Sequence, residues 1–563
     1  MKDYLRTEIR HVLDTLGDVP ESFEIELEKP AREEHGDLAT NTAMRLASVL
    51  QSNPRSIAED IAEGLRERVD PDRIRAVEVA GPGFINFRFS QNYLFRGLAD
   101  LLEAGERYGR SDRGAGRTAL VEYVSANPTG PLTVGHGRNA VLGDTIANLL
   151  DWTGHEVTRE YYFNDAGRQM RVLGASVRAR YEAIAADDVP TKTIEVDEGD
   201  AVEVPESFPE DGYLGDYITD IARSVYDEHG ASLLTTETLR PFIEAAEEQI
   251  LAEIEDTLAD LDIHMDAFFN EQSLYDEGQV QSVVDALTEN GYTYEEDDAL
   301  WFKATEFGRE KDRVLIKQSG EATYRTPDIA YHVTKFERDF DVIVDIFGAD
   351  HIDAYPDVLA ALDVLGYDAD RVEVILYQFV TLVRGGEPVK MSTRRANYVT
   401  LDDLIEEVGA DVARFFFLMR SSDTHLNFDL ELAKEASDKN PVFYLQYAHA
   451  RICSVIDKAE EVGLSFDAEP DLSLLTHEDE VALMKELLRF PTELQKAAEA
   501  RAPHFVPTYL REVATAFSQF YDTCRIIGED EDLAAARLHL ALAAQTVLRN
   551  GLTVLGISAP RQM

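Results

Sequence analysis

Short apolar runs alternate with amphipathic stretches through the middle of the chain. Residues 119–124 have the pattern of a buried strand, and the following residues 125–135 contain two prolines and two glycines. A helix is expected from about Gly137, with Leu142, Ile146 and Leu149 on one face. This order predicts the first β-turn-α unit of a parallel sheet.

A second strand is expected at 155–162 and further buried strands at 341–348 and 376–383, with a strand-rich segment near 291–318. Residues 184–214 are acidic, contain prolines and lack a helical period, so we expect a solvated surface insertion there. Helices and one strand pair precede the sheet, and helices follow it. We predict domains at 1–110, at 111–400 with an insertion at about 170–300, and at 401–563.

The composition is strongly acidic, with a formal charge of −53 and 13 lysines against 41 arginines. Because 44% of the residues are apolar, we expect a folded protein rather than a disordered one. A large acidic excess in a folded chain is typical of a cytoplasmic protein from a high-salt organism such as a halophilic archaeon. The two cysteines are 71 residues apart, so no disulfide framework and no zinc site is expected. We also expect no membrane span.

Gly135, His136 and Gly137 close the turn at the expected helix start. Unpaired N–H groups at a helix N-terminus attract phosphate, and glycines allow a close approach of the backbone. His136 adds a further donor. A histidine at a helix start is also an ordinary cap, so these three residues alone leave a structural role open.

The wider stretch SANPTGPLTVGHGR (125–138) resembles the HIGH region of class I aminoacyl-tRNA synthetases, in the form found in arginyl-tRNA synthetases. The resemblance places Thr133 where the family usually has a histidine, and His136 on the second histidine. It implies catalytic roles for His136 and Thr133, with ATP bound at Gly135, His136 and Gly137. A threonine hydroxyl can bond a phosphate but carries no charge.

A second motif follows two glycines. Lys390, Met391, Ser392 and Thr393 resemble the KMSK loop of the same class, with threonine in place of the last lysine. The resemblance implies that Lys390 is catalytic and that Lys390, Met391 and Ser392 bind ATP. A glycine-hinged loop can carry an ammonium group onto phosphates as charge develops.

The stretch YRTPDIAYH (324–332) resembles the family's second specificity element. The resemblance implies that Asp328 and Tyr324 hold the guanidinium of arginine, a planar group that a carboxylate matches. It places Glu122, Ser125 and Asn127 on the opposite wall and His351 near the amino acid or ATP. Asp328 could also be only a helix-opening acid, because Pro327 precedes it.

Two other regions resemble the tRNA-binding parts of arginyl-tRNA synthetases. Residues 80–87 resemble the N-terminal domain that contacts the D-loop, which implies roles for Phe84 and Asn86. Residues 440–451 resemble the opening helix of the anticodon-binding bundle. The implied anticodon contacts are Tyr444, Tyr447, Arg451, Tyr521 and Met563, and aromatic planes suit unstacked bases.

The resemblance spans the chain and implies an α/β protein. The expected parts are a Rossmann-type class I synthetase catalytic sheet, an N-terminal small α/β domain and a C-terminal all-α anticodon-binding bundle. The implied partners are tRNA(Arg), L-arginine and ATP with Mg²⁺, and a monomer is expected. Two alternatives stay open, another class I-type nucleotidyl-transfer ligase and a non-catalytic tRNA-binding protein.

Overall fold

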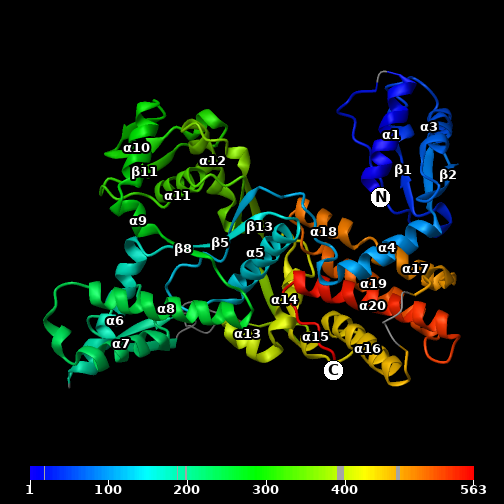
Figure 1. Ribbon diagram of the computed structural model, residues 1–563. Coiled ribbons are helices and arrows are strands. Elements are labelled where there is room, and N and C mark those ends of the chain that lie inside the picture. Colours follow the sequence, from blue (N-terminus) through cyan, green and yellow to red (C-terminus); the bar gives the residue numbers. More distant parts are fainter. Residues whose placement is uncertain (18, 187, 197–199, 390–398, 465–469) are drawn as a thin grey trace. The chain divides into compact units, whose positions relative to one another are not determined.

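The computed structural model describes residues 1–563 except 18, 187, 197–199, 390–398 and 465–469 (Figure 1). The chain divides into two compact units, which are described separately. The first unit comprises Met1–Tyr108, Ile452–Arg489 and Val513–Val547. The second comprises Gly109–Arg451, Phe490–Glu512 and Leu548–Met563.

The N-terminal part of the first unit is a three-stranded antiparallel sheet in the order β1-β3-β2, packed against helices. The strands and helices are β1 (Leu38–Thr40), β2 (Ile74–Ala80), β3 (Phe84–Phe89), α1 (Lys2–Leu16), α2 (Thr42–Leu46), α3 (Pro54–Arg68) and α4 (Gln91–Ala104). Leu5, Ile61 and Phe87 are fully buried in its core. The predicted strand pair is confirmed, with Val77 opposite Phe87.

The second unit contains a five-stranded parallel sheet in the order β13-β12-β4-β5-β8. Its strands are β4 (Thr118–Glu122), β5 (Glu156–Phe163), β8 (Ala267–Asn270), β12 (Val342–Gly348) and β13 (Val372–Tyr377). The chain order reverses between β4 and β12. In open α/β sheets, ligands bind at the carboxyl ends of the strands beside such a reversal.

Helices and insertions connect these strands. The helix α5 (Val134–Trp152) joins β4 to β5, and α12 (Tyr355–Val364) joins β12 to β13. Between β5 and β8 lie α6 (Gly167–Ala185), β6 (Thr191–Val196), β7 (Asp200–Pro205), α7 (Asp216–His229) and α8 (Arg240–Asp260). Between β8 and β12 lie α9 (Glu271–Asp276), α10 (Gln279–Glu289), β9 (Thr293–Glu296), β10 (Ala299–Phe302), β11 (Arg313–Ile316) and α11 (Arg325–Glu337). The sheet strand β8 thus lies within the range expected for a single insertion.

The acidic segment 184–214, for which the sequence predicted a solvated surface insertion without a helical period, contains a β-hairpin. β6 and β7 pair antiparallel, and Val204 and Phe208 pack against Ala179 of α6. Residues 191–193 and 202–204 each place a charged side chain between two β-branched ones. This period of two is the strand signal, and the acidic composition obscured it.

The chain beyond the parallel sheet is mainly helical, as predicted. A small sheet of β14 (Val380–Arg384), β15 (Glu387–Pro388) and β16 (Leu426–Asp429) interrupts it. The helices are α13 (Leu401–Val408), α14 (Ala410–Leu418), α15 (Leu430–Lys434), α16 (Pro441–Glu461), α17 (Glu478–Leu487), α18 (Phe490–Glu499), α19 (Phe505–Thr523) and α20 (Glu531–Val554). Among the described residues, no helix has the length and apolar character needed to cross a bilayer.

Candidate active site

The carboxyl end of β4 continues into a strained turn. Val124 and Ser125 have φ values of 65° and 40°, in the left-handed region that β-branched residues rarely adopt. The Val124 N–H donates to Asn139 Oδ1 at 2.8 Å, and Asn139 Nδ2 donates to the Ile346 carbonyl at 2.9 Å. A side chain of α5 therefore holds this turn beside β12, at the point where the strand order reverses.

The helix α5 begins at Val134, about one turn earlier than the sequence indicated, with Thr133 as its N-cap. The Thr133 N–H donates to His136 Nδ1 at 3.1 Å, so the neutral ring carries its proton on Nε2. Burial lowers the pKa of His136 to about 4, and the ring is neutral at pH 7. His136 is thus an uncharged donor at a helix start, where backbone N–H groups are also unpaired.

The two glycines around His136 serve different purposes. A Cβ on Gly137 would lie 2.5 Å from Leu401 Cδ1 and 3.1 Å from Phe417 Cε2. At Gly135 the nearest atom would be Thr133 Oγ1, at 3.7 Å. Gly137 therefore permits close packing of α5 against α13 and α14, whereas the backbone of Gly135 has free space beside it.

Three of the predicted ATP-binding residues, Lys390, Met391 and Ser392, lie outside the described residues. The chain that follows them returns to the turn before α5. Thr400 pairs with Thr133 in an antiparallel bridge, and the Leu401 N–H donates to the Leu132 carbonyl at 2.8 Å. The end of the segment with the second motif is thereby anchored to the turn with the first.

Arg138 secures the other side of α5. It is fully buried and donates to the carbonyls of Gln378, Ser421 and Thr424 at 2.6, 2.9 and 3.0 Å. Burial lowers the pKa of Arg138 to about 10. The arginine thus ties α5 to the chain after β13 and to the turn before β16.

A buried ionic cluster lies between β4, β12 and α11. Lys335 Nζ is 2.5 Å from Glu122 Oε2 and 2.7 Å from Asp345 Oδ1, and Glu122 and Asp345 are opposite each other in the sheet. His332 Nε2 lies 2.9 Å from the other oxygen of Asp345. Burial acts to raise the pKa of Asp345, but Lys335 and His332 outweigh it and lower that pKa. The cluster fixes α11 against the strand ends.

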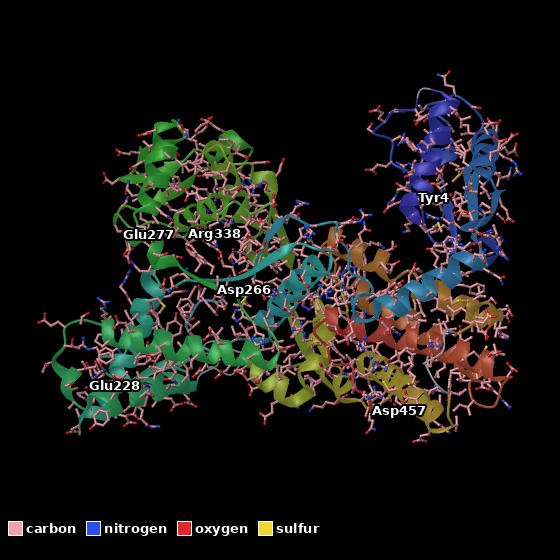
Figure 2. The ribbon with its side chains drawn as sticks, in the orientation of Figure 1. Tyr4, Glu228, Asp266, Glu277, Arg338 and Asp457 are labelled. Atoms are coloured by element: carbon pink, nitrogen blue, oxygen red, sulfur yellow. The ribbon has the colours of Figure 1, made fainter. Side chains whose placement is uncertain are left out.

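A second set of polar groups holds the far side of α11. Glu160 of β5 accepts a hydrogen bond from the Tyr331 hydroxyl at 2.6 Å and one from Arg338 Nη2 at 2.8 Å (Arg338 is labelled in Figure 2). The Tyr331 ring stacks on Tyr162 at 4.3 Å between centroids. Helix α11 is therefore held by charged groups from three strands, which sets the position of its first turn.

Asp328 lies in that first turn and is half-buried. Burial raises the pKa of Asp328 to about 7, the carboxylates of Glu271 and Glu122 act in the same direction, and His332 and Lys335 oppose it. Among the described residues, no Lys, Arg or His nitrogen lies within 4 Å of this carboxylate. An acid of this kind favours a cationic ligand, which would supply the missing charge.

Glu122 and Ser125 form a pair beneath the strained turn. Glu122 is 3% exposed. One of its oxygens accepts from Ser125 Oγ at 2.9 Å, and the other contacts Lys335. Ser125 Oγ in turn accepts the Tyr162 N–H at 3.1 Å. Both oxygens of Glu122 thus have protein partners.

The other three residues assigned to arginine are more accessible. Asn127 is exposed in the turn, and Tyr324 at the start of α11 is 58% exposed. His351 is exposed after the end of β12, where its ring stacks on Phe347 with centroids 5.3 Å apart. These side chains come from three chain segments around the carboxyl ends of β4 and β12.

The residues assigned to tRNA differ in exposure. Phe84, Tyr447 and Met563 are 41%, 49% and 56% exposed, and Tyr444, Arg451 and Tyr521 are half-buried. Asn86 is only 4% exposed in the middle of β3, and this burial favours a structural role for its amide.

Comparison with known proteins identifies the class. Family models match three successive parts of the chain: the arginyl tRNA synthetase N-terminal domain at residues 3–89, the class I (R) tRNA synthetase catalytic domain at 98–415, and the DALR anticodon-binding domain at 445–563. The parallel sheet and its glycine-rich turn are the catalytic domain of a class I aminoacyl-tRNA synthetase. This finding confirms the predicted fold class.

Relatives over the whole length narrow the class to a family. The chain is 76% identical to an arginine–tRNA ligase of Salinibacter ruber over 563 residues, all of both chains. It is 49% identical to one of Desulfotalea psychrophila, over 95% of this chain and 94% of the relative. The arginyl-tRNA synthetase of Thermus thermophilus has the same fold, with a TM-score of 0.77 at 23% identity over both whole chains. The chain belongs to the arginyl-tRNA synthetase family and is an arginine–tRNA ligase.

Proposed function

We propose that the chain first activates L-arginine with ATP and then esterifies the 3′ end of tRNA(Arg). In the first step, an oxygen of the arginine carboxylate attacks the α-phosphorus of ATP, giving arginyl-adenylate and pyrophosphate. In the second step, a hydroxyl of the terminal ribose attacks the adenylate carbonyl, and AMP leaves. The protein contributes mainly by orienting the reactants and stabilising the developing charge.

The Asp328 carboxylate binds the guanidinium group of arginine, with Tyr324 beside it. The observation that carries this assignment is the half-buried Asp328 without an ion-pair partner among the described residues. Asn127, Ser125 and His351 face the remaining groups of the amino acid. Glu122 acts indirectly, because its oxygens are bonded to Ser125 and Lys335.

The start of α5 binds the phosphates of ATP. Gly135 offers its backbone N–H and His136 offers its Nε2–H. The Gly137 N–H donates to the Thr133 carbonyl at 3.0 Å, so Gly137 contributes by its small size at the helix start, and the Thr133 hydroxyl stands where the family usually has an imidazole. Lys390 would approach the leaving phosphates from its loop, together with Met391 and Ser392. The bridge between Thr400 and Thr133 supports this, because it joins the end of that loop to the start of α5.

Magnesium would enter with ATP, on which it neutralises phosphate charge. Mg²⁺ usually keeps several waters and takes most of its other ligands from the phosphates. Among the described residues, no group of three or more His, Cys, Asp or Glu side chains is arranged to hold a metal ion. A site made largely by the nucleotide is compatible with that arrangement.

The body of tRNA(Arg) would contact both ends of the chain. The exposed Phe84 ring offers a stacking surface to an unpaired base of the D-loop. For the anticodon, the family resemblance supplies the contacts Tyr444, Tyr447, Arg451, Tyr521 and Met563. Exposed or half-buried aromatic rings with an arginine nearby are typical of surfaces that bind unstacked bases.

An aminoacylation assay with a tRNA pool and each of the amino acids separately tests the proposed activity. Arginine alone should be esterified, and the reaction should require ATP. Charging with a different amino acid, or no charging with arginine, would contradict the assignment of the Asp328 pocket.

The affinity for arginine should depend on pH through Asp328. The guanidinium pairs with the carboxylate form, so below the pKa of about 7 binding must first release a proton. The Kd for arginine should therefore rise about tenfold from pH 8 to pH 6. Calorimetry at several pH values, with lysine as a control ligand, measures this. A Kd that is flat across this range would contradict the raised pKa.

Salt should increase both activity and stability. The chain carries a formal charge of −53, so it repels itself and tRNA at low ionic strength. The Debye length falls from about 30 Å at 0.01 M salt to about 3 Å at 1 M. We expect aminoacylation and the thermal midpoint to rise together along a KCl series from about 0.05 to 3 M, contrary to the usual effect of salt on nucleic-acid binding. Maxima below about 0.2 M would exclude screening as the cause.

The same charge supports a high-salt cytoplasm as the working environment, and we expect the working form to be a monomer. The relative from Salinibacter ruber is bacterial, so the sequence comparison gives no support to an archaeal source.

A further inference from the structure

Both ring nitrogens of His332 face hydrogen-bond acceptors. Nδ1 lies 2.7 Å from the backbone carbonyl oxygen of Asp328, and Nε2 lies 2.9 Å from Oδ2 of Asp345. A carbonyl oxygen can only accept. Burial acts to raise the pKa of Asp345, but Lys335, which contacts its other oxygen at 2.7 Å, holds that pKa well below its usual range, so this carboxylate also accepts. Each ring nitrogen must therefore carry a proton, and the ring is an imidazolium cation.

The imidazolium balances the charge of a buried set of four side chains. His332 is 5% exposed, and Asp345 and Lys335 are fully buried. Glu122, whose carboxylate contacts Lys335, completes the set and is also buried. With the ring charged, the four residues carry two positive and two negative charges. With a neutral ring they would carry one uncompensated negative charge, which is unfavourable inside a protein.

The charge of this ring acts on Asp328, the acid assigned to the guanidinium. His332 follows Asp328 by four residues in α11, so the two side chains lie on the same face of the helix. Burial has the largest effect on the pKa of Asp328 and raises it to about 7, and His332 is the strongest opposing influence. Glu271 and Glu122 raise this pKa further. Without the cation, Asp328 would hold a proton more tightly, and a protonated acid can hydrogen-bond a neutral ligand.

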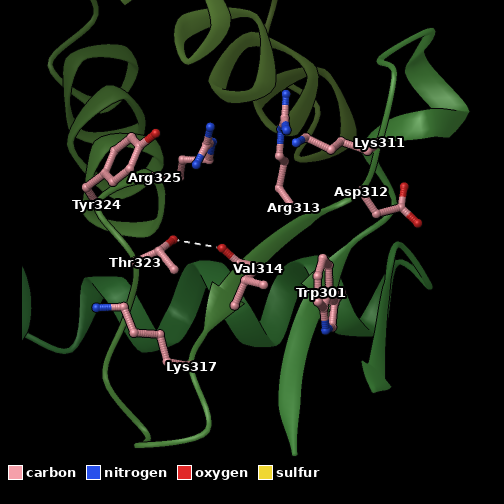
Figure 3. A pocket seen from close by; sticks show the side chains of 9 residues that line it. All are labelled: Trp301, Lys311, Asp312, Arg313, Val314, Lys317, Thr323, Tyr324 and Arg325. Atoms are coloured by element: carbon pink, nitrogen blue, oxygen red, sulfur yellow. Dashed lines mark hydrogen bonds between the residues drawn. The ribbon is translucent and has the colours of Figure 1, made fainter. Parts of the chain in front are cut away.

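The backbone around Asp328 is fixed on both sides. Before it, the Thr323 hydroxyl donates to the Val314 carbonyl at 2.8 Å, which ties the start of α11 to β11 (Figure 3). After it, the His332 ring joins the Asp328 carbonyl to Asp345 of β12. The same ring thus positions the first turn of α11 and supplies it with positive charge.

We propose that His332 is a positioning residue that determines specificity: as a buried imidazolium it keeps the Asp328 carboxylate ionised, so that the pocket selects a cationic guanidinium over a neutral group of the same shape. The inference rests on the proposed role of Asp328 in binding arginine. Citrulline is the discriminating ligand, because its urea group has an oxygen in place of one guanidinium nitrogen and carries no charge.

The variant His332→Gln keeps a neutral amide donor near Asp345 but removes the charge. The Kd for arginine should rise about fivefold at pH 7 and about tenfold at pH 6, and the difference from wild type should vanish near pH 9.5, where Asp328 ionises without help. The Kd for citrulline should not rise. Calorimetry with both ligands across this pH range measures these affinities. The control His264→Gln removes an imidazole that is 74% exposed and should change neither Kd.

Equal losses for arginine and citrulline at every pH would give His332 a purely structural role and overturn the proposal. Unchanged affinities for both ligands would overturn it as well. The retained selectivity of a correctly folded variant is therefore as informative as its loss, and the thermal midpoint of the variant shows whether it has folded.

The protonation of the ring can also be measured in the wild type, without any ligand. A nitrogen–proton NMR spectrum of labelled histidine side chains should show His332 protonated on both nitrogens from pH 6 to pH 9, a range in which exposed histidines lose a proton. A ring with one protonated nitrogen at pH 7 would contradict the imidazolium. This result is readable even if Asp328 does not bind arginine, and failure of the proposed function would appear separately in the charging assay.

Discussion

Substitution of Asp328 by Asn is expected to raise the Kd for arginine by about 30-fold to several thousand-fold, which corresponds to about 2–5 kcal/mol. The substitution keeps the size of the side chain but removes the charge that pairs with the guanidinium. The pocket offers no replacement, because Glu122 is occupied by Ser125 and Lys335. Equilibrium binding of arginine and of ATP, measured separately, gives the two affinities.

ATP affinity should hardly change in this variant, and the pH dependence of arginine binding between pH 6 and 8 should disappear with the titrating group. A matched control is Glu321→Gln, which removes an exposed acid nearby that pairs with Arg171. If Asp328→Asn weakened arginine and ATP equally, or only lowered the thermal midpoint, Asp328 would be a helix-opening acid with a structural role.

The sequence pattern predicted the parallel sheet because its strands are continuous apolar runs between turn residues. β4, β5 and β12 appear close to their expected positions, since a strand covered on both faces has little polar alternation. The single strand expected at 376–383 was wrong: β13 ends at Tyr377, and residues 380–384 form β14 in a different sheet. The start of α5 was misplaced by about one turn. Periodicity detects the helix body well, whereas the cap at Thr133 depends on a local hydrogen bond to His136.

The buried contacts that hold the site in place could not be predicted in the same way. Lys335 contacts Glu122 across 213 residues of sequence, and no local pattern indicates which distant carboxylate a lysine will meet. Lysine and arginine side chains are normally exposed, so nothing in the sequence marks Lys335 and Arg138 as buried residues. Only the folded sheet brings their partners together, so the motifs indicated the reacting groups but not the residues that position them.

Removal of the His136 imidazole is expected to have the other large effect. His136→Ala should lower kcat for adenylate formation by about 10²–10³-fold, because a preorganised donor to the phosphates is lost in the transition state. The Kd values for arginine and tRNA should stay near wild type. Single-turnover pyrophosphate release at saturating substrates measures the chemical step.

His136→Ala is also expected to lower the stability of the fold, and this effect must be separated from the loss of catalysis. The His136 ring also accepts the Thr133 N–H, and loss of such a cap costs about 0.5–2 kcal/mol of stability. The thermal midpoint should therefore be recorded for each variant. His136→Gln keeps a side-chain donor and should recover part of kcat, whereas His264→Ala removes an imidazole that is 74% exposed and should change neither quantity.

Because the pKa of His136 is about 4, the wild-type rate should show no titration of this ring between pH 6 and 9. A wild-type kcat in His136→Ala would remove this histidine from the mechanism, and the helix N–H groups would then have to bind the phosphates alone.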